Sequence, residues 1–215
     1  MGIGADAHEH RRTKADKEER YEQQGLLHDR DHVEFLYQRH GAMTEGLWPR
    51  RESSRFQIQR HRGLGMHNEV NLRIRALLED EDDWVAAMAT VACELHHAFE
   101  HFHWTGFYRT TEPNVLKIGP YQGGHGCLYI PFDKGICGAA ARTGETQDVP
   151  DVHARPEHIA CSSSTNSEVV VPVKDSTGAV VAVLDVDSDT PAAFSPDDVT
   201  FLEQICTYLG EKFHS

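Results

Sequence analysis

The hydrophobic period of this 215-residue chain changes twice, and that change limits the folds open to it. Apolar residues recur at helical spacing over residues 70–78 and 84–102, and again over 199–213. Between these segments the pattern shifts to short runs typical of β-strands, separated by turn signals such as Gly123-Gly124. The runs cover residues 104–110, 115–121, 128–132, 169–173 and 180–187. Helices around a set of mainly hairpin-linked strands predict an α+β domain with an antiparallel sheet.

The last helix carries its own start signal. Ser195 is a capping residue, Pro196 suits the first helical position, and Asp197 and Asp198 place negative charge in the first turn. The helix should then bury one apolar stripe. Its expected members are Val199, Leu202, Ile205, Leu209 and Phe213. The first helix should likewise bury Val70, Ile74, Leu77 and Leu78.

Charge and polarity divide the chain near residue 63. Residues 1–63 contain 12 Lys+Arg and 11 Asp+Glu, whereas the rest of the chain contains 9 and 23. We expect a polar N-terminal extension over 1–63, mobile or partly helical, and one folded domain over 64–215. An acidic domain repels phosphate and anionic lipid, so nucleic acid and membranes are poor partners. The chain has neither an apolar run of membrane-spanning length nor a signal peptide, so we expect a soluble cytoplasmic protein.

Three of the five cysteines fall in one part of the sequence. Cys127, Cys137 and Cys161 lie in the Gly-rich stretch between the middle strands, where we expect mobile, exposed backbone. Cys93 and Cys206 lie inside helices and suit small core positions. In an intracellular protein, three thiols in one loop-rich region favour redox chemistry or metal binding over a structural disulfide framework.

Zinc is the rival to redox chemistry at these thiols. His125, His153 and His158 lie close to the three cysteines in sequence, and sulfur with nitrogen ligands suits zinc. The chain has no C-x2-C pair, however, and the gaps between the cysteines match no familiar zinc module. The sequence therefore favours redox thiols without a metal.

Three carboxylates form a second candidate group, Glu168, Asp185 and Asp187. The two aspartates are one residue apart at the end of the apolar run 180–187, so the strand period of two places them on the same face. A carboxylate in such surroundings is costly unless it meets a cation or shares a proton. We interpret these acids as part of a site; the alternative is that the strand simply ends there and its acids reach water.

With these cysteines and carboxylates, the sequence resembles the GAF-domain free methionine-(R)-sulfoxide reductases. The resemblance runs over about residues 65–212 and includes the three cysteines at the family's spacing. Its most specific stretches are Trp104-Thr105-Gly106-Phe107-Tyr108, Gly119-Pro120-Tyr121-Gln122-Gly123, Ile130-Pro131-Phe132, Gly135-Ile136-Cys137-Gly138, Val149-Pro150-Asp151-Val152-His153-Ala154, His158-Ile159-Ala160-Cys161 and Ser167-Glu168-Val169-Val170-Val171-Pro172. The resemblance implies a GAF domain: a central antiparallel sheet of about six strands, helices packed on one face, and a ligand pocket on the other.

The resemblance also implies an activity and its residues. Cys161 would be the nucleophile, Cys127 the main resolving thiol and Cys137 a secondary redox partner. The residues implied around the substrate are Trp104, Tyr108, Glu168, Asp185 and Asp187. The substrate would be free methionine-(R)-sulfoxide, with no cofactor and with thioredoxin as external reductant.

The implied chemistry suits these residue types. Reduction needs a thiolate to attack the sulfoxide sulfur and an acid to protonate the departing oxygen. Neighbouring carboxylates raise one another's pKa, so Glu168 or Asp187 is the expected acid. Two departures from the family pattern, Ser162 after Cys161 and Arg155, remove no reacting group.

Two hypotheses from other functional classes stay open. A GAF sensory module would bind a small ligand without chemistry, and a zinc-bound scaffold would hold a metal at the cysteines. The three thiols favour the enzyme over the sensor. From the fold alone we expect a homodimer formed through the terminal helices.

Overall fold

The structure is a computed structural model that describes residues 65–155 and 164–215. These residues belong to one compact unit, and the predicted extension over 1–63 lies outside them. The helices are α4 (Met66–Leu77), α5 (Trp84–Ala98), α6 (Gly135–Thr143) and α7 (Pro196–Phe213), with a short 3-10 helix at Val152–Ala154. The strands are β1 (Trp104–Glu112), β2 (Val115–Gln122), β3 (Tyr129–Pro131), β4 (Gln147–Val149), β5 (Ser167–Lys174) and β6 (Val180–Ser188).

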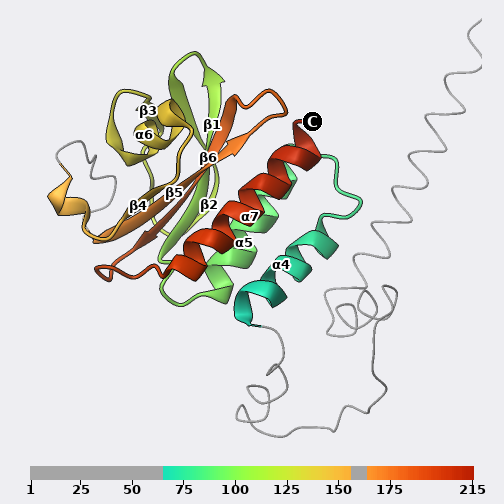
Figure 1. Cartoon of the computed structure of the whole chain (residues 1–215), viewed down its shortest axis with the longest axis horizontal. Helices are drawn as coiled ribbons and strands as arrows, with labels where there is room; N and C mark the ends of the chain where they lie inside the picture. The colour runs from blue at the N-terminus through green and yellow to red at the C-terminus, as the bar shows by residue number, and fades with distance from the viewer. Residues whose placement is uncertain (1–64, 156–163) are drawn as a thin grey trace, which may run out of the picture. The chain divides into compact units, whose positions relative to one another are not determined.

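The six strands form one sheet in the order β3-β2-β1-β6-β5-β4, and every neighbouring pair is antiparallel (Figure 1). The central pair joins β1 to β6, two strands far apart in the sequence, with Trp104 opposite Asp187. On the other side of β6, Asp187 lies opposite Glu168 of β5. The predicted α+β class and the antiparallel sheet of about six strands are confirmed. The short strand β4 was not predicted.

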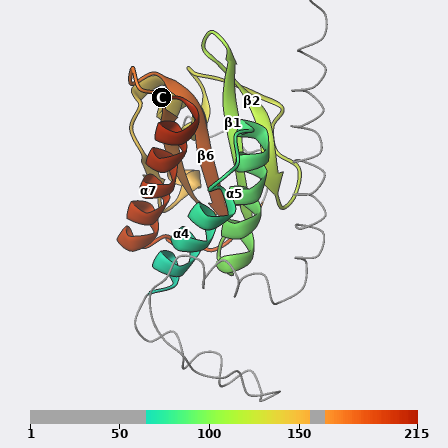
Figure 2. The same ribbon diagram turned by 90° about the vertical axis from the view of Figure 1, so that its right-hand side faces the viewer.

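Helices α4, α5 and α7 enclose the main hydrophobic core on one face of the sheet (Figure 2). Helix α5 begins after Asp83, whose side chain accepts a hydrogen bond from the Ala86 amide. Helix α7 begins with the predicted cap: Ser195 and Asp198 bond each other's backbone in a capping box. In α7, Leu202, Ile205 and Leu209 are buried, with Val199 and Phe213 packed against the core.

The first helix departs from its prediction at one position. Val70, Ile74 and Leu78 are buried, as expected, but Leu77 is 43% exposed. Leu77 follows the buried Ile74 by three positions, at the edge of the apolar stripe, where the helix turns its side chain out of the core. Among the described residues no helix combines the length and the apolar character needed to cross a membrane.

The opposite face of the sheet is covered by α6, which the sequence analysis did not predict. Its residues from Gly135 to Ala141 are all buried, and a second apolar cluster packs Ile136, Cys137 and Ala140 against the sheet. The expectation that Cys137 lies in mobile, exposed backbone is therefore wrong: this thiol is in a helix and 4% exposed. Burial between the sheet and the chain around it stabilises a helix with two glycines that has little propensity of its own.

Candidate functional site

Strand register brings the three predicted carboxylates to one region of the sheet. Trp104, Asp187 and Glu168 lie directly opposite one another on β1, β6 and β5. Asp185 is two residues from Asp187, so both side chains lie on the same face of β6. Trp104, a neighbour on this face, belongs to the second apolar cluster, which also includes residues of α6. The predicted common face of Asp185 and Asp187 is thus present, on the side away from the main core.

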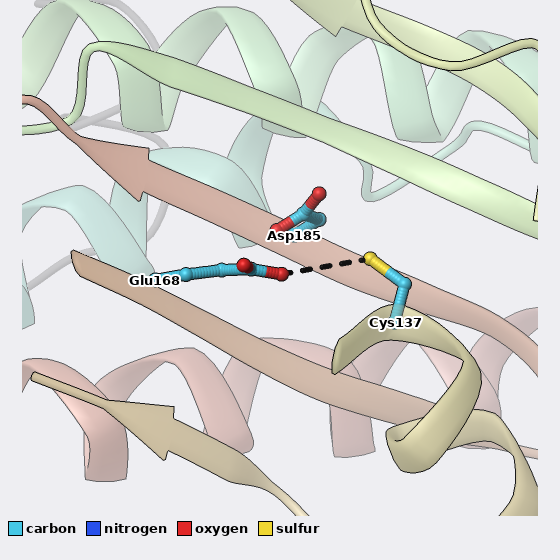
Figure 3. Close-up of side chains that lie close together, drawn as sticks. All are labelled: Cys137, Glu168 and Asp185. Atoms are coloured by element: carbon cyan, nitrogen blue, oxygen red, sulfur yellow. Dashed lines mark hydrogen bonds between the residues drawn. The ribbon is translucent and has the colours of Figure 1, made fainter. Parts of the chain in front are cut away.

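Helix α6 places Cys137 over two of these acids (Figure 3). The Cys137 thiol donates a hydrogen bond to Oε1 of Glu168, with Sγ and Oε1 3.9 Å apart. One ligand atom each from Cys137, Glu168 and Asp185 lies within 4.8 Å of the others, and all three residues are buried. One carboxylate oxygen of Asp185, Oδ1, is buried without a hydrogen-bond partner. The group therefore brings two carboxyl groups and a thiol together in a buried place.

Burial makes these acids hold their protons. Loss of water raises the pKa of Glu168 well above its ordinary value, and Asp185 and Asp187 raise it further. Burial likewise raises the pKa of Asp187. The pKa of Asp185 is raised by burial to about 7, although hydrogen bonds from Cys137 and Glu168 act in the opposite direction. Burial, followed by the charges of Asp185 and Glu168, also raises the pKa of the Cys137 thiol. The raised pKa values favour the protonated forms of Glu168, Asp187 and the Cys137 thiol, whereas Asp185 changes its charge near neutral pH.

We expect Asp185→Asn to stabilise the folded domain at pH 8. The folded pKa of about 7 lies above the ordinary value of 3.8, so the stability that goes with the bound proton is complete below about pH 4 and lost as pH rises through 7. An isolated shift of this size corresponds to about 4 kcal/mol, and proton sharing with Glu168 reduces it, so we expect a gain of roughly 2 kcal/mol. Urea unfolding of the variant and the wild type at pH 8 and pH 4 measures this difference in the free energy of unfolding.

Asp189→Asn is the matched control for this experiment. Asp189 is exposed just after the end of β6, so its substitution should change the free energy of unfolding by less than about 0.5 kcal/mol at either pH. Equal stability of wild type and Asp185→Asn at pH 8 would contradict the burial of an ionised Asp185.

Aromatic rings from β1 and β2 form a wall beside the acids. Trp104 stacks on Tyr108 and on Tyr121, with ring centroids 5.8 and 5.4 Å apart. Tyr108 is 1% exposed, and burial together with the charges of Asp185 and Cys137 raises its pKa, so the phenol stays protonated. Tyr121 was not among the predicted site residues. Its place opposite Gly106, which has no side chain, explains its contact with Trp104 but was not readable from the sequence.

The loop that follows β2 lies on this wall and carries Cys127. The Trp104 indole N–H donates to the Gly124 carbonyl at 3.0 Å. At Gly126 the backbone comes so close that a Cβ would lie 2.8 Å from the Tyr108 hydroxyl. Cys127 is half-buried, lies in the loop as predicted, and is disulfide-bonded. Packing of the loop on the wall therefore determines where this sulfur lies relative to the acids.

The remaining predicted residues are distributed as follows. Cys161, Ser162 and His158 lie outside the described residues. His153 is exposed and its Nε2 lies 3.1 Å from Oδ1 of Asn166, while Arg155 donates to the Gln147 side chain at 3.4 Å. Within the described ranges the group of side chains close enough to hold a metal ion is Cys137, Glu168 and Asp185, and it contains neither His125 nor His153. The histidine and cysteine set considered for zinc is therefore not brought together there.

A known protein family matches most of this domain. The family model of the GAF domain covers residues 76–212. The chain belongs to the GAF family. As a GAF domain it has the sheet, the helices and the site-bearing face described above, and the predicted resemblance is confirmed.

Relatives of this GAF domain include named enzymes. The free methionine-R-sulfoxide reductase of Saccharomyces cerevisiae is 38% identical over 150 residues, which cover 67% of this chain and 83% of the relative. A solved structure of free methionine-R-sulfoxide reductase from Neisseria meningitidis, in complex with its substrate, is 42% identical with a TM-score of 0.65, and the match covers 68% of this chain and 87% of that one. A Burkholderia vietnamiensis protein proposed to be a GAF sensor is 37% identical with a TM-score of 0.66, over 69% of this chain and 93% of that one.

Proposed function

We propose that this GAF domain reduces free methionine-(R)-sulfoxide to methionine in the cytoplasm, as a defence against oxidative damage. The observation that carries the proposal is the buried group of acids on β5 and β6 beside the Trp104 wall. It is supported by the relatives named free methionine-R-sulfoxide reductase, from which the preference for the R form is taken. A site that combines a cation-binding carboxylate with a protonated acid suits a substrate with an ammonium group and a sulfoxide oxygen.

Selection of the free amino acid follows from its charge. Free methionine sulfoxide carries an ammonium group, which becomes an uncharged amide nitrogen inside a polypeptide. We assign the ammonium to Asp185 and Asp187, because Asp185 has a buried oxygen without a partner and Asp187 is only half-buried. A bound cation lowers the pKa of a neighbouring carboxyl, so the two aspartates would ionise when the substrate binds. A peptide-bound substrate would leave this charge unpaired in a buried site, which is costly.

The reacting sulfur is assigned to Cys161. Its thiolate attacks the sulfoxide sulfur and forms a bond between the two sulfurs while the oxygen takes up a proton. The oxygen then passes to Sγ of Cys161 as its bond to the substrate sulfur and the bond between the two sulfurs break, so methionine leaves and Cys161 becomes a sulfenic acid. Glu168 is the proposed proton donor, because burial and the neighbouring aspartates raise its pKa. The Cys127 thiol then displaces water from the sulfenic acid to form a disulfide, and a dithiol such as thioredoxin reduces that disulfide. The sum is one sulfoxide and one dithiol converted to methionine, a disulfide and water.

Two described features support these assignments. Cys127 is found disulfide-bonded, which is the state that a resolving cysteine reaches after each turnover. The loop that carries it packs on Trp104 and Tyr108, so substrate entry and disulfide exchange both involve this loop. Cys137 is assigned a different role from the other two thiols. Its raised pKa makes it a poor nucleophile, so it acts chiefly as a hydrogen-bond donor to Glu168, and exchange through Cys137 is secondary.

The test is a comparison of four substrates on the purified full chain. With a thioredoxin system we expect turnover of free methionine-(R)-sulfoxide, and at least roughly 100-fold lower kcat/KM for the free S form and for both peptide-bound forms, because a desolvated unpaired charge costs several kcal/mol. Loss of NADPH through thioredoxin reductase measures the rate. Equal rates on free and peptide-bound sulfoxide would contradict the assigned ammonium site.

A sensory module is the second candidate function. The similarity to a protein proposed to be a GAF sensor favours it, and many domains of one fold only bind ligands. A sensor would bind methionine sulfoxide or another small ligand without releasing methionine. Release of one equivalent of methionine from the reduced protein, without any added reductant, distinguishes the enzyme from the sensor.

A further inference from the structure

The two residues that directly follow Cys127 in the sequence have large apolar side chains that are exposed to solvent. Leu128 is 65% exposed and Tyr129 is 56% exposed. The other large exposed hydrophobic side chains in the described ranges belong to α4 and the first turn of α5, on the opposite face of the sheet. Single exposed apolar residues are common, but this exposed pair directly follows a disulfide-bonded cysteine, so a protein that reduced the disulfide through Cys127 would approach close to it.

The backbone at the same place is open for pairing. Among the strands that the structure describes, β3 is an edge of the sheet and pairs only with β2. The Leu128 carbonyl accepts from the Ile118 amide and the Phe132 amide donates to the Asn114 carbonyl, so these alternate residues face β2. Antiparallel alternation therefore points the N–H and C=O of Tyr129 away from the sheet. An extended segment of another protein can pair with such groups.

Helix α6 covers the rest of this edge. A Cβ at Gly138 would lie 2.5 Å from the Pro131 carbonyl, and the Arg142 guanidinium donates to the Phe132 carbonyl. The open part of the edge is thus the end at Leu128 and Tyr129, next to Cys127.

The surroundings of β3 are basic on an otherwise acidic domain. Lys117 lies with its Nζ 5.4 Å from the centre of the Tyr129 ring. Lys134 and Arg142 are exposed beyond the other end of β3, where the Arg142 guanidinium donates to the Phe132 carbonyl. Asp133 is the one acid between residues 113 and 144, whereas residues 64–215 together contain 23 acids and 9 bases. A partner with apolar and acidic side chains around its reactive group complements this surface.

We propose that Leu128, Tyr129 and the free edge of β3 form the docking surface for a dithiol protein of the thioredoxin class. This proposal rests on the proposed function, since it concerns how the oxidised enzyme is reduced. The thiolate of the docked protein attacks Sγ of Cys127, the existing S–S bond breaks, and the sulfur that was bonded to Cys127 leaves as a thiolate and takes up a proton. The partner's second thiolate then attacks the mixed disulfide and releases Cys127. Two electrons pass from the dithiol, which becomes a disulfide, to the enzyme.

A macromolecular reductant needs this surface and a small one does not. Cys127 is half-buried, so a protein thiolate reaches it in line with the S–S bond only when the surrounding surfaces fit. Leu128 supplies apolar area, Tyr129 supplies a ring and the edge amide, and Lys117 supplies charge. Dithiothreitol, by contrast, is small enough to reach the disulfide without a docking surface.

The experiment uses the full chain with Leu128→Ser and Tyr129→Ser combined. We expect kcat/KM for thioredoxin to fall at least about tenfold, which is roughly the effect of losing two interface contacts. Turnover with dithiothreitol and the single-turnover release of methionine should stay at wild-type values. Tyr129→Phe should retain most of the thioredoxin-driven rate because it keeps the ring and the backbone edge.

The matched control is Leu72→Ser combined with Leu77→Ser, which removes two similarly exposed apolar side chains from α4. It should leave both reductant-driven rates unchanged. Wild-type kcat/KM for thioredoxin in the Leu128/Tyr129 variant would overturn the docking surface, as would an equal fall with both reductants. Failure of the proposed function looks different: the wild-type chain itself would then release no methionine with dithiothreitol.

Discussion

Cys161→Ser is expected to abolish the reduction of free methionine-(R)-sulfoxide. A serine hydroxyl is not ionised near neutral pH and forms no sulfenic acid, so both the attack on sulfur and the transfer of oxygen are lost. Loss of a nucleophile leaves only binding and electrostatic effects, and we expect the rate to fall by roughly 10³-fold or more. Release of methionine from the reduced protein, followed by chromatography in a single turnover, measures the chemical step without any reductant.

Cys127→Ser is the matched control, since it makes the same change at the other thiol in the proposed exchange. It should release about one equivalent of methionine per chain in the first turnover and then slow with thioredoxin, because the sulfenic acid lacks its resolving partner. A single-turnover yield in Cys161→Ser equal to that of wild type would refute the assigned nucleophile. Unchanged steady-state turnover in Cys127→Ser would refute the assigned resolving thiol.

Glu168→Gln is expected to lower the single-turnover rate by about 100-fold, the usual loss when a general acid is removed. The glutamine keeps the size of the side chain and its acceptor for the Cys137 thiol, but it carries no dissociable proton. A donor acts only while protonated, so the wild-type rate should fall as pH rises through the raised pKa of Glu168. The variant should lose this high-pH decline. Rapid-quench measurement of methionine between pH 6 and 10 gives both results.

Asp187→Asn separates proton donation from binding of the ammonium group. Asp187 lies opposite Glu168 in the sheet and its pKa is likewise raised by loss of water, yet we assign it to the ammonium. Its substitution should raise KM and leave the single-turnover rate at saturating substrate within about threefold of wild type. If Glu168→Gln instead raises KM and keeps the wild-type pH profile, Glu168 binds the substrate charge and is not the donor.

Local signals in the sequence were enough to predict most of the helices and strands. The cap at Ser195, the apolar runs that became β1, β2, β5 and β6, and the alternation that places Asp185 and Asp187 on one face depend on neighbours a few residues apart. The fold class followed from these elements and is confirmed. The family followed from ordered motifs and is confirmed by the comparisons.

The candidate site could not be predicted from local sequence alone, because it depends on contacts between residues that are far apart in the sequence. Helix α6 has two glycines in its first four residues and no polar face, so its spacing resembled a loop, and only packing on the sheet makes it helical. That packing brings Cys137 to Glu168, 31 residues away, and converts an expected exposed thiol into a buried hydrogen-bond donor. Strand order likewise brings together Trp104 and Asp187, which lie opposite each other although they are 83 positions apart in the sequence.

The sequence by itself therefore determined most of the helices and strands and the face of β6 that holds Asp185 and Asp187, because periodicity and capping act locally. The tertiary structure alone decided which of these groups meet, how deeply they are buried, and hence which remain protonated. Desolvation and charge repulsion depend on everything that surrounds a group in space, and neither is encoded in the spacing of a motif.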